Sequence, residues 1–155
     1  IACVAVLAGA VSPAGPYAGA WAGLTERVVG SRHSGLAIDG FDPVAYFTDA
    51  EAMKGEPEVE ASKAGAVWRF RNAANRAVFL AHPEIYGPRF GGYDPVDVAQ
   101  GKAVAGRAQL WLISGERLYL FSREDNRTAF AADPDGILKH ASGRWPALVE
   151  SLSNY

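Results

Sequence analysis

The chain has 155 residues, of which 49% are hydrophobic and 21% are charged, close to an average globular domain, which excludes a disordered or collagen-like chain. Its formal charge is −2. A domain that binds nucleic acid through the phosphates usually carries a basic excess, so we exclude nucleic acid as a partner. The one cysteine, Cys3, excludes an intrachain disulfide and a zinc site built from several thiolates.

The beginning of the sequence indicates export. Residues 1–25 carry no charge, and residues 1–11 form a small and apolar run as long as the hydrophobic region of a signal peptide but too short to span a membrane. We therefore predict a partial signal peptide over residues 1–20, a leader over residues 21–35, and a location in the bacterial periplasm with no membrane span in the mature chain. The alternatives are a structural N-terminal helix and a lipoprotein acylated at Cys3.

Residues 36–155 are predicted to form one domain that contains an internal repeat. Gly40-Phe41-Asp42-Pro43-Val44 returns 52 positions later as Gly92-Tyr93-Asp94-Pro95-Val96. A second set of residues returns 51 positions later: Trp68, Phe70, Asn75, Arg76, Phe79 and Pro83 recur as Tyr119, Phe121, Asn126, Arg127, Phe130 and Pro134. We interpret the domain as two related halves, residues 40–83 and 92–134, followed by a C-terminal helix.

Each half is predicted to be a β-hairpin followed by a helix. In the first half, residues 59–61 and 67–70 read as strands and residues 73–81 as a helix. In the second half, residues 110–113 and 118–121 read as strands, and their apolar residues on both faces predict a buried central pair.

The rest of the second half is predicted to be helical. Ser122-Arg123-Glu124-Asp125 matches a capping-box pattern before a helix over residues 126–132. Apolar residues at helical spacing then predict a C-terminal helix between residues 137 and 152. The fold class is therefore α+β, with two tandem ββα-like repeats forming a small antiparallel sheet and helices packed on it. The aromatic residues at core spacing are assigned to the interior: Trp68, Trp111, Tyr119 and Trp145.

The loop between the halves, from Ile85 to Pro95, is the candidate site. Its paired glycines permit close backbone approach, and a rigid scaffold often carries such a binding loop. The candidate ligand-binding residues are those of the loop, its repeat counterpart and the neighbouring histidine: Asp94, Tyr93, Arg89, Asp42 and His82. Of these, Asp94, Asp42 and His82 are candidate metal ligands, and a metal ion is the candidate cofactor.

Structural roles compete with this interpretation. The loop can be a plain linker, and His82 can be an ordinary surface residue. An aspartate before proline is a standard start of a helix, and this capping role is the one we favour for Asp42 and Asp94. A structural role is also favoured for the repeated Asn-Arg pairs, in which arginine packs its stem on the preceding strand.

The sequence offers little support for an enzyme. Neither a nucleophile elbow nor a phosphate-binding glycine loop is present. A hydrolase or a redox enzyme is therefore the least supported class.

Several motifs resemble YHS-domain proteins of the exported bacterial type. The motifs are Gly-Phe-Asp-Pro-Val-Ala-Tyr-Phe at residues 40–47, Tyr-Gly-Pro-Arg-Phe-Gly-Gly-Tyr at residues 86–93, Leu-Tyr-Leu at residues 118–120 and Trp145-Pro146. The resemblance spans about Leu36 to Leu148, and it implies an exported, small α+β module. The Tyr-His-Ser signature that gives the family its name is absent.

Some members of that family are associated with metal handling through a cysteine that follows Gly-Gly-Tyr. In this chain Asp94 occupies that position. A hard carboxylate in place of a soft thiolate removes the main support for copper or zinc.

Two functions from different classes follow from the sequence. The first is an exported, non-enzymatic, YHS-like module that binds a metal ion or a small ligand near the loop between the halves. The second is a protein-interaction or assembly module without a small-ligand site, which predicts an exposed cluster of Tyr86, Phe90 and Tyr93. The sequence does not indicate the oligomeric state.

Overall fold

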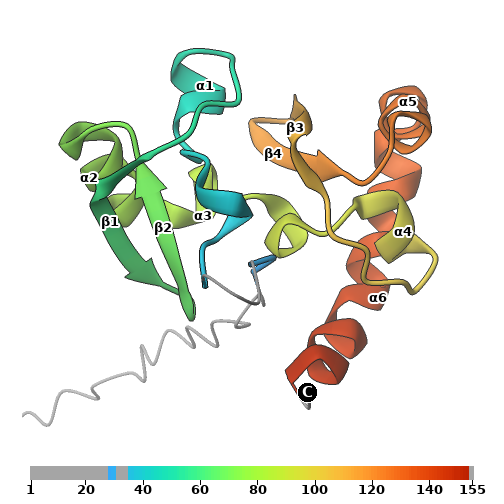
Figure 1. Ribbon diagram of the computed structural model, residues 1–155. Coiled ribbons are helices and arrows are strands. Elements are labelled where there is room, and N and C mark those ends of the chain that lie inside the picture. Colours follow the sequence, from blue (N-terminus) through green and yellow to red (C-terminus); the bar gives the residue numbers. More distant parts are fainter. Residues whose placement is uncertain (1–27, 31–34, 154–155) are drawn as a thin grey trace, which may run out of the picture.

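The computed structural model describes residues 28–30 and 35–153, so the predicted signal peptide, Cys3 and most of the predicted leader lie outside the described residues. The first unit contains η1 Ile38–Gly40, α1 Ala45–Thr48, β1 Glu56–Lys63, β2 Ala66–Phe70, α2 Ala73–Ala81 and α3 Pro83–Tyr86. The second unit contains η2 Arg89–Gly92, α4 Pro95–Ala99, β3 Arg107–Ser114, β4 Arg117–Phe121, α5 Glu124–Ala132 and α6 Pro134–Ser153. The predicted α+β class is confirmed (Figure 1).

Both units have the same order of elements: a 3-10 turn, a short helix, an antiparallel hairpin and two helices. Both hairpins turn through two residues of positive φ, at residues 64–65 and 115–116, the backbone of a type I′ turn. Both also carry a register irregularity at the same place, between Glu56 and Glu60 in the first unit and between Arg107 and Trp111 in the second. The backbone therefore repeats in detail.

The strands form two separate two-stranded sheets, β1-β2 and β3-β4. One edge of β2 pairs with β1, and Leu36 forms an isolated parallel bridge with Val67 of β2. The bridge lies on the edge of β2 that does not face β1. Figure 1 shows the two hairpins in different parts of the molecule.

Strand β4 lies between two hydrophobic cores. Leu118 and Leu120 belong to the core of the first unit, whereas Tyr119 and Phe121 belong to the core of the second. All four are buried, because successive side chains of a strand point to opposite faces. The prediction that the second hairpin is buried on both faces is therefore confirmed for β4.

One phenylalanine attaches the first long helix of each unit to its hairpin. Phe79 of α2 has its ring centroid 4.7 Å from that of Trp68, and Phe130 of α5 has its ring centroid 4.7 Å from that of Tyr119. The two units differ in the helix that follows, since α3 has 4 residues and α6 has 20. Within the described residues, no helix combines the length and the apolar character needed to cross a lipid bilayer.

Candidate functional site

Asp94 lies at the centre of a hydrogen-bond network in the second unit. Its side chain is fully buried. Its Oδ1 accepts from the backbone N–H of Val96 at 2.9 Å. Its Oδ2 accepts from the backbone N–H of Ser122 at 2.7 Å, from the Ser122 hydroxyl at 2.9 Å and from Asn126 Nδ2 at 2.8 Å. The carboxylate thus ties the start of α4 to the end of β4 and to α5.

Asp42 forms the equivalent network in the first unit and is also fully buried. Its Oδ1 accepts from the backbone N–H of Val44 at 2.8 Å. Its Oδ2 accepts at 2.7 Å from the backbone N–H of Arg71 and from Asn75 Nδ2. Each of these partners has its counterpart 51 or 52 positions later in the second unit.

The second unit adds another buried acid, Asp97, where the first unit has Ala45. Asp97 Oδ2 accepts from the Ser122 hydroxyl at 3.0 Å and from Asn126 Nδ2 at 3.1 Å, and its Oδ1 lies 3.3 Å from the guanidinium of Arg123. The capping box predicted at Ser122 is therefore wrong. The hydroxyl donates to the two aspartates, and residue 123, the N-cap of α5, makes no capping side-chain bond.

These contacts give the aspartates a structural role. Asp94 is the N-cap of α4 through its bond to Val96, as we predicted. The same prediction is wrong for Asp42, because α1 begins only at Ala45 and its N-cap is Val44, with no capping side chain. Four donors of its own chain surround the Asp94 carboxylate, one at Oδ1 and three at Oδ2, and both oxygens therefore have a partner. The group is satisfied without a ligand.

The structure does not bring the three candidate metal ligands, Asp42, Asp94 and His82, into one site. The aspartates are buried in separate units, while the His82 side chain is 58% exposed, with Nδ1 3.4 Å from Glu84. Among the described residues, no three His, Cys, Asp or Glu side chains gather into a group that could hold a metal ion. Each aspartate instead accepts hydrogen bonds from backbone amides and an asparagine of its own unit.

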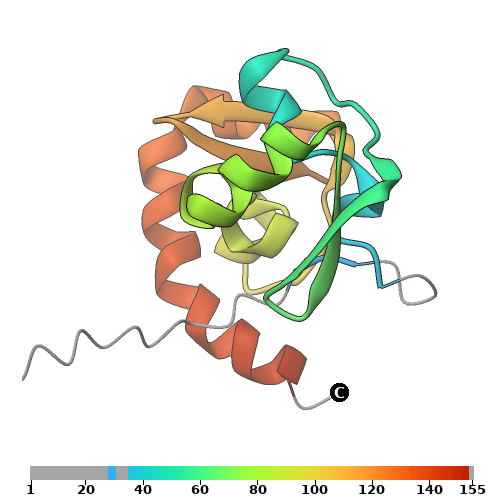
Figure 2. The ribbon, with the colours of Figure 1, turned by 90° about the vertical axis from the view of Figure 1, so that its left-hand side faces the viewer.

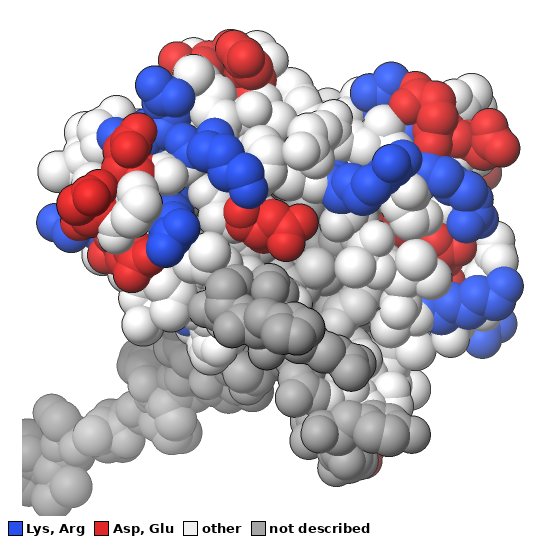
Figure 3. Space-filling view, in the orientation of Figure 1, with Lys and Arg blue, Asp and Glu red and all other residues white. Residues whose placement is uncertain are grey.

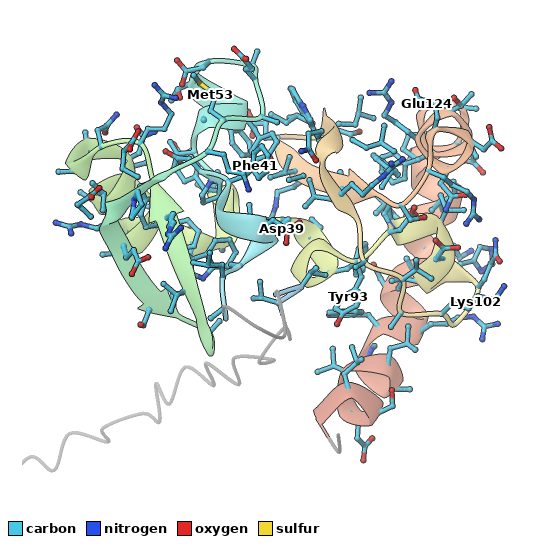
Figure 4. The ribbon with its side chains drawn as sticks, in the orientation of Figure 1. Asp39, Phe41, Met53, Tyr93, Lys102 and Glu124 are labelled. Carbon is cyan, nitrogen blue, oxygen red and sulfur yellow. The ribbon has the colours of Figure 1, made fainter. Side chains whose placement is uncertain are left out.

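The remaining loop residues pack against the second core. Tyr93 is half-buried, with its ring 5.9 Å from that of Trp145, and Figure 4 shows it beside α6. Arg89 lies over the Phe90 ring at 5.4 Å. Burial raises the pKa of the Tyr119 hydroxyl, and the positive charges of Arg89 and Arg117 act in the opposite direction. Arg89 thus faces a tyrosine of β4.

The exposed aromatic cluster expected of an interaction module is not formed. Phe90 is 1% exposed, and it adopts a positive φ of 52° that turns it into the second core. Tyr86 packs against the first core and Tyr93 against the second. The loop therefore crosses from one core to the other, with Tyr86 packed on the first core and Phe90 and Tyr93 on the second.

A groove lies where the two units meet. It is open to solvent and has a volume of about 440 Å³, and residues of both units line it: Phe47, Ile85, Tyr86, Ile113 and Glu116. The rings of Phe47 and Tyr86 meet edge to face with centroids 5.1 Å apart, which fixes one wall. In both ribbon views α1 lies beside the β3-β4 hairpin that supplies the opposite wall (Figures 1 and 2).

The groove is apolar apart from one carboxylate. Glu116 lies in the turn between β3 and β4 with φ of 60°, and its side chain makes no hydrogen bond or ion pair to any residue that the structure describes. Figure 3 shows charged side chains gathered over the two units, and between them mostly uncharged atoms with one acidic patch at the centre of this face. The groove therefore offers apolar walls and a single negative charge.

Sequence reasoning placed Ile85 and Tyr86 at the edge of the candidate loop but missed the other three groove residues, Phe47, Ile113 and Glu116. Phe47 and Ile113 are far apart in the sequence and meet only through the packing of the units. It also missed Asn75 and Asn126 as partners of the aspartates, although a signal was available. Besides the aspartates and the arginines that follow the asparagines, these are the polar residues that recur unchanged in the matched motifs.

Comparisons of this chain with protein-family models, with curated proteins and with solved structures found no match. The resemblance to YHS-domain proteins stays a prediction from the motifs.

Proposed function

We propose that this chain is an exported, YHS-like, non-enzymatic binding module whose ligand occupies the groove between the two units. The proposed ligand is a small apolar molecule, best an aromatic one, that carries a positively charged group. The observation that carries the proposal is the groove itself, because residues of both units line it.

The apolar walls account for the affinity. Phe47, Tyr86 and Ile113 present apolar surface, and Ile85 is 38% exposed at the edge of the groove. Small-molecule sites are typically concave and mostly apolar, with a few polar groups that fix the orientation of the ligand. A flat apolar ligand would remove these side chains from water, and the Phe47–Tyr86 contact holds two of them in position beforehand.

Glu116 accounts for the charge preference. Among the described residues that line the groove, Glu116 alone is charged, so a cation gains a Coulomb attraction to its carboxylate and an anion is repelled. An ammonium group near the groove would also lie close to the aromatic rings, whose faces attract cations. We therefore expect amines to bind better than acids of the same shape.

A titration followed by NMR tests the proposal, with 2-phenylethylamine and phenylacetate as probes. We expect saturable amide shifts at Phe47, Tyr86 and Ile113 with the amine, and weaker ones with the acid. Glu116→Gln is expected to weaken amine binding about fivefold, the value of one partly exposed ion pair. Glu150→Gln, on the exposed surface of α6, is the matched charge control and should bind like the parent.

Two results would contradict the proposal. One is the absence of saturable shifts at the groove with either probe. The other is amine binding that is unchanged in Tyr86→Ala, since that substitution removes one aromatic wall.

A further inference from the structure

The outer face of α2 is exposed and entirely apolar. Its exposed residues are Ala73, Ala74, Ala77, Val78, Leu80 and Ala81. At 3.6 residues per turn they cover a continuous arc of about 160° around the helix. Val78 and Leu80 are 38% and 45% exposed and belong to the few large hydrophobic side chains exposed in the described part of the chain. A surface helix normally presents polar residues to water.

The second unit provides a comparison within the same fold. Helix α5 is the counterpart of α2, attached in the same way through Phe130. At the positions of Ala73, Ala74 and Ala77 it carries Glu124, Asp125 and Thr128, and Figure 4 shows Glu124 on the outside of the molecule. The fold itself therefore does not require an apolar outer face on this helix.

No described element covers this face. Helix α2 contacts β1, β2 and α3, which lie on its inner side and at its end, and Figure 2 shows it on the near surface with no other helix or strand in front. Four of its six exposed residues are alanines, so a second helix could approach closely, toward the lower end of the usual 8–10 Å between helix axes.

The charges at the two ends of α2 match those of an inverted copy. Arg71 precedes the helix, and its side chain has no ion pair or hydrogen bond among the described residues. Glu84 follows the helix and is exposed, and its carboxylate lies 3.4 Å from His82 Nδ1, its ion-pair partner in the described part of the chain. In an antiparallel pair of helices related by a twofold axis, the Arg71 end of each helix lies beside the Glu84 end of the other, so the contact occurs two times. The helix dipoles also oppose each other in this arrangement.

We infer that the occupant of this face is a second copy of the chain, bound through α2 against α2 in an antiparallel, twofold-symmetric contact. Ala77, the middle residue of Ala73–Ala81, lies at the axis and faces its own copy. The contact between two nine-residue helices is small, so the dimer is weak and forms in exchange with the monomer. This inference is independent of the ligand proposed above.

Sedimentation velocity over a wide range of protein concentration tests the dimer. The parent chain is expected to shift from monomer toward dimer as its concentration rises. Ala77→Glu places two like charges at the axis and should leave a monomer at every concentration. Thr128→Glu, the same change at the equivalent exposed position of α5, is the matched control and should dimerise like the parent.

A charge exchange tests the orientation. Arg71→Glu and Glu84→Arg are each expected to raise the dimer Kd about fivefold or more, because each creates two like-charge contacts. The double variant, Arg71→Glu with Glu84→Arg, should restore the parent value. A parent that stays monomeric throughout, a dimer that Thr128→Glu breaks and Ala77→Glu does not, or a double variant no better than the single ones would each overturn the inference.

Discussion

The two buried aspartates make a comparison that tests how this fold is held together. Asp94 accepts more hydrogen bonds than Asp42, yet we expect Asp42→Ala to destabilise the protein more than Asp94→Ala. The reason is Asp97, which contacts two of the Asp94 partners and has no counterpart in the first unit.

The magnitude follows from the donors that each substitution leaves unpaired. Without Asp94, the Ser122 hydroxyl retains Asp97 as acceptor and Asn126 Nδ2 keeps one of its two bonds. The backbone N–H groups of Val96 and Ser122 are then the two donor groups left with no acceptor. At about 1–3 kcal/mol for each unsatisfied donor, the cost is about 2–6 kcal/mol.

Without Asp42, three donors lose their acceptor: the backbone N–H groups of Val44 and Arg71, and Asn75 Nδ2. The expected cost is about 3–9 kcal/mol, with the lower part favoured because water reaches the part-buried groups. The difference between the two variants is one donor, about 1–3 kcal/mol.

Urea unfolding followed by tryptophan fluorescence measures both effects, because Trp68 lies in the first core and Trp145 in the second. A double-mutant cycle of Asp94→Ala and Asp97→Ala supplies the control. Removing both acids should cost more than the sum of the single effects by about 1–3 kcal/mol, since each acid is the other's substitute acceptor. Additive costs, or a smaller cost for Asp42→Ala than for Asp94→Ala, would refute the reasoning.

Further predictions concern the turn, two glycines and a buried tyrosine. Glu116→Gly should leave the thermal stability unchanged or slightly higher, because glycine adopts the positive φ of this position without strain. It should also weaken amine binding. A loss of thermal stability would contradict this account of the turn. Gly106→Ala should lower the free energy of unfolding by more than about 2 kcal/mol, because the added Cβ would lie 2.6 Å from Leu120. Gly143→Ala places its Cβ where no atom lies within 4 Å, and it should raise the free energy of unfolding by about 0.5–1 kcal/mol. Equal effects of the two substitutions in denaturant unfolding would argue against the close approach at Gly106. Burial raises the pKa of the Tyr46 hydroxyl above its usual 10.0. The stability that comes from this group is therefore complete below pH 10 and is lost as the hydroxyl ionises in the unfolded chain at higher pH. The free energy of unfolding of Tyr46→Phe should fall less steeply than that of the parent above pH 10, and parallel pH profiles of the two proteins would exclude this role.

The sequence predicted the elements whose signals are local. Alternating apolar residues and turn signals located both hairpins, and the helix at residues 73–81 was predicted with the bounds that α2 has. The 3-10 turns escaped prediction because Ile38 and Phe90 adopt positive φ values of 42° and 52°, a conformation that L-residues adopt only when tertiary packing enforces it.

The site was harder to predict because its residues are far apart in the sequence. Phe47 and Ile113 read as ordinary core residues, and only the packing of the two units turns them into walls of one groove. A repeated carboxylate can mark a repeated structural bond or a repeated ligand. We favoured helix capping for both aspartates; the structure confirms it for Asp94 alone and adds a bond from asparagine to each carboxylate. The asparagine at the matching position of each unit, Asn75 or Asn126, distinguishes the two possibilities.

Strand β4 makes the two units unequal partners. Its Leu118 and Leu120 complete the hydrophobic core of the first unit, so that unit cut from the chain after α3 would lack an inner wall and expose apolar surface. Either repeat expressed alone should therefore expose apolar surface and aggregate. A further copy added in series would need a strand whose two faces pack into two hydrophobic cores, as those of β4 do. The two units are therefore expected to unfold together, because a strand of the second unit completes the core of the first.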